Sequence, residues 1–220
     1  MSATTSAKHQ VLFSFRSTLY SRFGKRIFDL LLALLLLPVI SPVILMLWLI
    51  VSCDGGSGFF GHTRTGRNGQ EFRCWKIRSM VLDAELTLKD HLASEPVAAR
   101  EWLRNFKLVD DPRITKFGSF IRKTSLDELP QILNVLKGEM SFVGPRPVTQ
   151  RELRKYGLSR SAYLATTPGI TGLWQVSGRN SASYDERVEF DTRYAQRKSF
   201  ALDLWIISQT ATAVLKQTGQ

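Results

Sequence analysis

The chain has 220 residues, a formal net charge of +11 at pH 7 and a pI near 10.0. This length fits one domain with an appendage, and the charge favours anionic partners: nucleic acid, anionic lipid or a phosphorylated substrate. The two cysteines, Cys53 and Cys74, exclude a disulfide framework and favour a reducing, cytosolic environment.

The N-terminal region is polar and basic, and no acidic residue occurs before Arg26. We expect residues 1–21 to be flexible or disordered, with a surface helix starting near Leu19. Asp29, just after this region, is expected to form an ion pair with Arg26 or Lys25 on the helix face at the headgroup level. A secretory signal is not expected, because the apolar run that follows comes late, is too long and lacks a cleavage site with small residues.

That apolar run, from Leu30 to Val51, contains 22 residues without a charge. As a straight helix it would extend about 33 Å, enough to cross a bilayer core of about 30 Å. Pro38 and Pro42 remove successive backbone hydrogen bonds, which should bend or break it. Lys and Arg flank both ends, and this favours the cytoplasmic side for both flanks. We therefore predict a re-entrant membrane helix-break-helix over residues 22–52, with a single kinked span as the alternative.

Residues 53–220 are expected to form a small cytosolic domain. Two short strands around an Asn-Gly turn, residues 59–64 and 71–78, predict a β-hairpin. Helical patterns cover residues 83–108 with a division at Pro96, and two further helices are expected at 184–194 and 202–215. A short strand is expected at 173–176. The fold class is therefore α+β and mainly helical.

The stretch from Ser125 to Pro147 is where we expect the chemistry. Asp127 and Glu128 are adjacent near a predicted helix start, with Arg122 before them and Arg146 in a rigid turn after them. Carboxylates between arginines suit a site that handles phosphates and a divalent metal.

A structural explanation of the same residues stays open. Ser125 and Glu128 have the spacing of a capping box, and acidic residues are favoured in a first helical turn. Pro130 argues for a helix that begins there instead, because proline is accepted at the first helical position.

A second candidate phosphate site is the loop at residues 177–180. Its glycine permits close backbone approach, and Arg179 offers a planar guanidinium. Neither a P-loop nor a Rossmann fingerprint occurs in the chain.

Four blocks of sequence together resemble one known family. They resemble the bacterial sugar transferases, which are monotopic polyprenyl-phosphate phosphoglycosyl transferases, and most of all the exopolysaccharide-initiating undecaprenyl-phosphate hexose-1-phosphate transferases of the rhizobial succinoglycan type. The similarity covers about residues 22–215. The blocks are Lys25-Arg26-x-x-Asp29 with the following Ser41-Pro42, residues 122–131, residues 144–147 and residues 168–179.

The resemblance implies a two-step reaction. Asp127 would attack the β-phosphorus of a UDP-sugar and release UMP, and undecaprenyl phosphate would then accept the sugar phosphate from the aspartate. Glu128 would stand beside Asp127, with Mg²⁺ held by these two carboxylates. Arg122 and Arg146 would bind substrate phosphate, with Arg179 as a further candidate. Residues Ser41 and Pro42 would form the break in the membrane helix.

The expected partners are a UDP-hexose (galactose or glucose), undecaprenyl phosphate and membrane lipid, but no nucleic acid. The expected location is the cytoplasmic face of a bacterial inner membrane. A homodimer is one expected assembly, and the sequence leaves both the oligomeric state and the sugar open. Three alternatives remain: a non-catalytic scaffold of a polysaccharide assembly complex, a membrane-tethered nucleic-acid binder, and a single-span transferase with an external active site.

Overall fold

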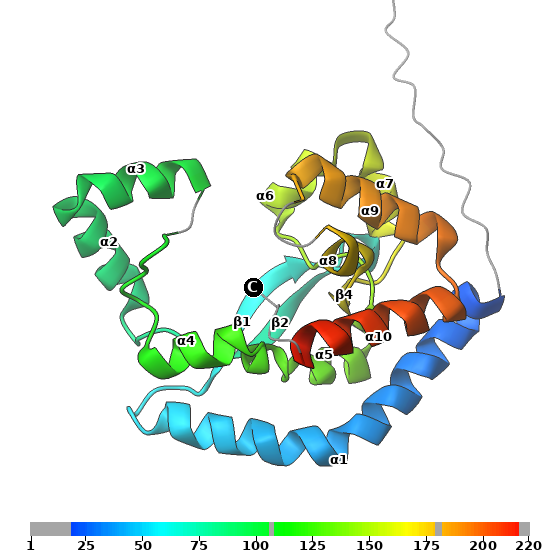
Figure 1. The fold of residues 1–220 in the computed structure, drawn as a ribbon, viewed down its shortest axis with the longest axis horizontal. Helices are drawn as coiled ribbons and strands as arrows, with labels where there is room; N and C mark the ends of the chain where they lie inside the picture. Colours follow the sequence, from blue (N-terminus) through cyan, green and yellow to red (C-terminus); the bar gives the residue numbers. More distant parts are fainter. Residues whose placement is uncertain (1–18, 106–107, 179–181, 216–220) are drawn as a thin grey trace, which may run out of the picture.

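The computed structural model describes residues 19–105, 108–178 and 182–215. The fold is α+β and mainly helical, as predicted (Figure 1). Most of the N-terminal segment predicted to be flexible, residues 1–18, lies outside the described residues.

The apolar segment forms helix α1 (Lys25–Ser52), which follows a short π-helical turn (Tyr20–Gly24). Its backbone stays helical through Pro38 and Pro42. Figure 1 shows a bend along α1, so the expected break takes the form of a bend within one helix. Each proline removes one backbone donor and its ring tilts the preceding turn, which bends a helix without having to interrupt it.

Helix α1 is long and apolar enough to cross a membrane by length and composition. Many of its large side chains face outward: Leu35 is 72% exposed and Val39 is 71% exposed. Its inner side belongs to the main core. There Ala33 and Leu47 pack in one cluster with Ile77, Ile121 and Ile132 of the remaining chain.

The predicted hairpin is confirmed. Strand β1 (Phe59–Thr65) pairs antiparallel with β2 (Glu71–Ile77). In the turn Asn68 and Gly69 adopt φ values of 58° and 81°, the left-handed conformation that Asn and Gly tolerate best.

The predicted helix pair that divides at Pro96 is also confirmed, as α2 (Ala84–Ser94) and α3 (Pro96–Asn105). Together they form an arm that extends away from the rest of the fold (Figure 1). A bridge between Met80 and Ile114 closes the base of this arm.

A second sheet of two parallel strands joins β3 (Ser141–Val143) to β4 (Gly169–Thr171). The strand expected at 173–176 is wrong, because these residues form helix α8 (Leu173–Ser177). The strand, β4, lies just before α8 because the chain must approach residues 141–144 closely there, which requires glycine. A Cβ at Gly169 would lie 2.1 Å from the backbone nitrogen of Gly144.

The remaining elements connect and cover these two sheets. In chain order they are α4 (Lys116–Lys123), a 3-10 turn (Leu126–Glu128), α5 (Gln131–Lys137), α6 (Gln150–Leu153), a 3-10 segment (Arg154–Ser159), α7 (Arg160–Leu164), α9 (Tyr184–Arg197) and α10 (Phe200–Leu215). The last two confirm the helices expected at 184–194 and 202–215.

Polar contacts also fix the start of α1 to the rest of the chain. Asp203, which is fully buried, accepts hydrogen bonds from the Tyr20 hydroxyl (2.6 Å), the Lys25 ammonium (2.7 Å) and the Tyr194 hydroxyl (2.7 Å). The result is a closed cluster in the interior, with a lysine paired to its central carboxylate.

Asp29 makes a second polar link between α1 and the remaining chain. It lies 3.8 Å from Lys25, which matches the ion pair expected on the helix face. It is nevertheless buried, and it accepts hydrogen bonds from the Ser141 hydroxyl (3.0 Å) and the Phe142 amide (3.1 Å) of β3. Asp29 therefore holds α1 against the second sheet.

Candidate active site

Helix α4 is placed by a close backbone approach. The side chain of Thr115 caps its first turn, accepting from the Gly118 amide at 2.8 Å. A Cβ at Gly118 would lie 2.0 Å from the carbonyl oxygen of Ser79, so only glycine fits there. At the far end of α4 the Arg122 Nε donates to the Ser79 hydroxyl at 2.8 Å. These contacts bring Arg122 beside the chain that leaves the hairpin.

The two carboxylates follow α4 directly. Ser125 adopts a left-handed conformation (φ 57°), and the chain then forms the 3-10 turn that carries Asp127 and Glu128. Ser125 makes no side-chain capping bond, so the capping-box interpretation is wrong. The α-helix begins at Gln131 with Pro130 as its N-cap, close to the start expected from proline.

Lys76 of β2 joins the two carboxylates. Its Nζ lies 2.7 Å from Glu128 Oε1 and 3.3 Å from Asp127 Oδ2. Asp127 is buried, whereas the side chains of Lys76 and Glu128 are each 31% exposed. The cluster is thus buried on the aspartate side and open on the other.

Lys76 is not among the site residues predicted from the sequence. A signal was present, since Lys76 follows Phe72 and Cys74 on one face of the strand by alternation. Both of those residues are buried. A charge on a buried face requires an opposite charge, because an unpaired one is costly there.

Burial and charge act in opposite directions at this cluster. Burial raises the pKa of Asp127, the nearby Lys76 lowers it and Glu128 raises it, so the pKa lies above the usual carboxyl range. The nearby Arg122 also favours the ionised form of Asp127, but desolvation by burial opposes it. Burial lowers the pKa of Lys76, but the charges of Glu128 and Asp127 raise it by more. The pKa therefore lies above its usual value, and the ammonium form is favoured.

The turn that carries Arg146 is fixed at both ends. The Gly144 amide donates to the Thr171 carbonyl (2.9 Å), and the Gly169 amide donates to the Pro145 carbonyl (2.8 Å). After the turn, the Thr65 amide of β1 donates to the Val148 carbonyl at 2.8 Å. Both sheets therefore hold this turn.

Arg146 itself is exposed, and its charge reaches the carboxylate cluster, where it lowers the pKa of Lys76. The neighbouring Glu152 accepts from Arg64 Nη1 at 3.0 Å and from the Thr149 amide at 2.8 Å. Burial raises the pKa of Glu152, but the Thr149 hydrogen bonds and the Arg64 charge bring it below its usual value. An ionised Glu152 thus braces the hairpin against the segment after Arg146.

The structure brings four predicted site residues into one region: Asp127 and Glu128 on the 3-10 turn, Arg122 on α4 and Arg146 in its turn. The Arg122 charge acts on Asp127 and lowers its pKa. Arg179 lies outside the described residues. The remaining predicted residues, Ser41 and Pro42, belong to the bent membrane helix.

The donor set for a metal is small. Within the described residues no group of three or more His, Cys, Asp or Glu side chains could hold a metal ion. The Asp127 and Glu128 pair nevertheless suits Mg²⁺, which is often bound through one or two carboxylates together with substrate phosphates and water. The residues present therefore fit Mg²⁺ only when substrate phosphates and water complete its coordination.

Known proteins similar to this chain belong to one family. The family described as bacterial sugar transferase matches residues 20–217. The chain is 51% identical over 199 residues, 90% of its length, to an undecaprenyl-phosphate galactose phosphotransferase of Salmonella typhimurium, of which it covers 42%. It is 50% identical over 197 residues to the exopolysaccharide production protein ExoY of Sinorhizobium fredii, covering 89% of this chain and 87% of that protein.

A more distant relative is the UDP-glucose:undecaprenyl-phosphate glucose-1-phosphate transferase of Escherichia coli, 36% identical over 199 residues, or 86% of this chain and 40% of that protein. The chain thus spans less than half the length of some curated relatives and most of the length of others. Because the match extends over nearly the whole described chain and includes the carboxylate cluster, the protein belongs to the bacterial sugar transferase family.

Proposed function

We propose that this protein transfers a hexose 1-phosphate from a UDP-hexose to undecaprenyl phosphate and so starts the assembly of an exopolysaccharide repeat unit. The observation that carries the proposal is the cluster of Lys76, Asp127 and Glu128, with a buried aspartate at its closed side. The names of the relatives support this substrate class, and they include both a galactose and a glucose enzyme.

Asp127 is the proposed nucleophile. One of its carboxylate oxygens forms a bond to the β-phosphorus of the donor, while the bond from that phosphorus to the bridging oxygen breaks and UMP leaves with the electron pair. In the second step a phosphate oxygen of undecaprenyl phosphate attacks the same phosphorus, and the aspartate leaves unchanged. A covalent intermediate of this kind lets one site serve a soluble and a lipid substrate in turn.

The other side chains supply charge and position. Lys76 and Arg122 lower the pKa of Asp127 and so oppose the effect of burial, which favours the reactive carboxylate. Arg122 and Arg146 are the proposed ligands of the donor phosphates, and cations there stabilise the charge that develops during transfer. Arg179 is proposed as a further phosphate contact.

Asp127 and Glu128 are the residues that would hold Mg²⁺ together with the donor diphosphate. The ion supplies charge neutralisation at the transferring phosphoryl group when bound. Lys76 occupies both carboxylates through its ion pairs. These ion pairs use Asp127 Oδ2 and Glu128 Oε1, so the other oxygen of each carboxylate is the one proposed to face the metal.

Helix α1 is proposed to enter and leave the membrane by the cytoplasmic face, with its bend near Ser41 and Pro42. The support is the bend in the helix and the basic residues on both flanks. This arrangement would hold the carboxylate cluster at the interface, where the phosphate of the lipid acceptor lies. A homodimer remains an expectation.

Intact-protein mass spectrometry tests the mechanism. The protein is incubated with Mg²⁺ and a panel of UDP-sugars, without lipid acceptor. A mass gain of one hexose phosphate in the wild type, absent from Asp127→Asn, is the expected result, and the donor that gives it identifies the sugar. Turnover with undecaprenyl phosphate but no adduct from any donor would contradict the covalent step.

Two rival functions are separated by the same preparation. A non-catalytic scaffold gives neither an adduct nor turnover, and Asp127→Asn then supports polysaccharide assembly as well as the wild type does. A membrane-tethered nucleic-acid binder would account for the charge of +11. It predicts retained RNA and binding that weakens steeply with salt.

A further inference from the structure

The hairpin carries a second group of side chains on the face that contains Lys76. In the antiparallel register Phe60 lies opposite Lys76, and His62 lies opposite Cys74. Side chains of directly opposed residues share one face of a sheet. Phe60 and His62 are therefore on the same side of the hairpin as the lysine that binds Asp127 and Glu128.

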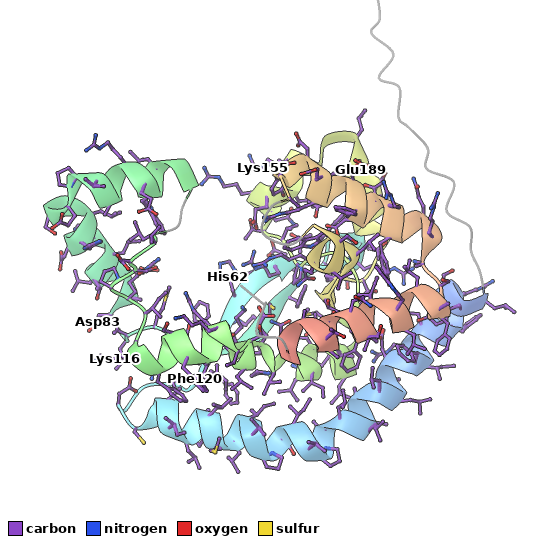
Figure 2. The ribbon with its side chains drawn as sticks, in the orientation of Figure 1. His62, Asp83, Lys116, Phe120, Lys155 and Glu189 are labelled. Carbon is purple, nitrogen blue, oxygen red and sulfur yellow. The ribbon has the colours of Figure 1, made fainter. Side chains whose placement is uncertain are left out.

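On β2 this face is buried at Phe72 and Cys74, but its β1 part, at the edge of the sheet, is exposed. Phe59, the preceding residue, stacks on Trp48 of α1 with ring centroids 6.5 Å apart. Because successive side chains of a strand point to opposite faces, Phe60 faces away from α1. It is 51% exposed, and His62 is exposed as well (His62 is labelled in Figure 2).

The two rings form an angled pair. Their centroids are 6.3 Å apart and their planes meet at 71°. A flat ligand ring that stacks on Phe60 would therefore meet the edge of His62. The exposed pair borders the cluster proposed to bind a diphosphate, which is where the base of a nucleotide donor would have to lie.

The hydrogen bonding of His62 fixes which nitrogen is available. Its Nδ1 lies 2.9 Å from the backbone carbonyl oxygen of Thr63. Since a carbonyl oxygen can only accept, Nδ1 carries the hydrogen, and in the neutral ring Nε2 is left as an acceptor. Nε2 is on the opposite side of the ring from this backbone contact.

We propose that Phe60 and His62 form the base-binding subsite for the donor nucleotide, with Phe60 stacking on the pyrimidine and His62 Nε2 accepting from the N3–H of uracil. This assignment rests on the proposed function. It also gives a reason for selectivity, because N3 of cytosine has a lone pair in place of the hydrogen and would face the lone pair of Nε2. A site built for a hydrogen bond discriminates strongly against a ligand that cannot make it.

The cationic side chains along the hairpin favour a nucleotide over the lipid chain as the occupant. Arg64 is the next residue on the same face of β1, and it holds Glu152 near Arg146. Along this face of β1 an aromatic ring (Phe60), an imidazole (His62) and a guanidinium (Arg64) therefore follow one another. An isoprenoid chain would instead approach from α1, which lies against the other face of β1.

The test measures nucleotide binding separately from turnover. Each variant is made in the full chain with Asp127→Asn, and calorimetric titrations with UDP and with CDP are compared. His62→Phe keeps an aromatic ring and removes the acceptor, so it should weaken UDP binding about tenfold and leave CDP binding unchanged. Phe60→Leu should weaken binding of both nucleotides. The matched control Thr63→Ala, on the opposite face, should bind both as the parent does.

Steady-state kinetics with Asp127 intact give an independent readout. His62→Phe should raise the KM for the UDP-sugar and leave the KM for undecaprenyl phosphate unchanged. A rise in the acceptor KM alone would overturn the proposal and assign this face to the lipid. Unchanged UDP affinity in both ring variants would overturn it too. Absence of turnover in the wild type would contradict the proposed function, while the titrations still decide the base-binding subsite.

Discussion

Two clusters in this molecule each contain one lysine and two carboxylates but differ in closure: Lys25 with Asp203 and Asp29, and Lys76 with Asp127 and Glu128. Around Asp203, two tyrosine hydroxyls and Lys25 occupy the carboxylate, and the residue is fully buried. Around Asp127 only Lys76 donates within the part of the chain that the structure describes. There the side chains of Lys76 and Glu128 remain 31% exposed.

This difference in closure distinguishes an ion pair that stabilises the fold from one that can take part in catalysis. A buried carboxylate whose oxygens are all hydrogen-bonded rigidifies the elements around it and has no capacity left for a ligand. A cluster with one closed and one open side keeps acceptors that a phosphate-bound metal can use. Charge content alone would not have told the two apart.

Asp127→Asn should produce the largest effect on activity. The amide keeps the shape of the side chain but cannot act as the nucleophile, so turnover should fall about 10,000-fold. The melting temperature should change little, because the side chain receives only one hydrogen bond from a described residue. Turnover assays and thermal unfolding in one detergent check both statements, and a variant retaining a tenth of wild-type turnover would remove Asp127 from the proposed role.

Asp203→Ala should produce the opposite pattern in stability. It leaves Lys25 without its closest carboxylate and the Tyr20 hydroxyl without this acceptor, while the buried Tyr194 hydroxyl keeps only the Val143 carbonyl. This should cost about 3–5 kcal/mol of unfolding free energy. The measurement is denaturant unfolding in detergent. Asp185→Ala, at an exposed position of α9, is the control and should cost less than about 1 kcal/mol. A loss below about 1 kcal/mol for Asp203→Ala would show that the closed cluster does not stabilise the fold.

Lys76→Met should slow turnover about 100-fold and change its pH dependence. Lys76 lowers the pKa of Asp127, so its removal raises that pKa further. The ionised nucleophile is then lost at higher pH during acidification, and the acid limb of the kcat profile should move upward. Arg73→Met, an exposed substitution on the other face of β2, should leave the profile in place. An unmoved acid limb in Lys76→Met would separate the lysine from the ionisation of Asp127.

Asp191 is a buried carboxylate with no ion pair to a described residue, and it should give the smallest effect. The Tyr156 hydroxyl donates to one of its oxygens at 2.7 Å, and burial raises its pKa to about 7. The folded state then holds a proton that the unfolded state releases near pH 4, so stability falls as pH rises from about 4 to 7.

Asp191→Asn should remove this contribution. The variant should gain about 1–2 kcal/mol relative to wild type between pH 5 and pH 8, because only the wild type must bury a charge at the higher pH. Thermal unfolding at the two pH values measures the difference. An equal change in both proteins would show that Asp191 does not titrate in this range.

Local patterns were enough to predict much of the fold and part of the site. The hairpin followed from its Asn-Gly turn, the division of the arm from Pro96, and the carboxylates of the site from their position between arginines. Lys76 was not selected because its partners are 51 and 52 residues away in the chain. Patterns within a short stretch of sequence cannot predict contacts between residues so far apart in the chain.

The remaining differences have the same origin. The strand predicted at residues 173–176 lies earlier in the chain, as β4, because its position depends on pairing with β3. No local sequence pattern predicted β3. Asp29 was expected at the headgroup level beside Lys25, yet its decisive partners are Ser141 and the Phe142 amide. Both errors concern positions whose structure is set by distant segments.

The shared core of α1 and the remaining chain has a consequence for protein engineering. Arg26 donates to the last carbonyls of α5, at Val135 and Leu136, and Ala33 is completely enclosed. Deleting the membrane segment to obtain a water-soluble enzyme would therefore open the core and release the end of α5. A soluble version has to keep α1 and replace only its outward apolar side chains, such as Leu35 and Val39, with polar ones.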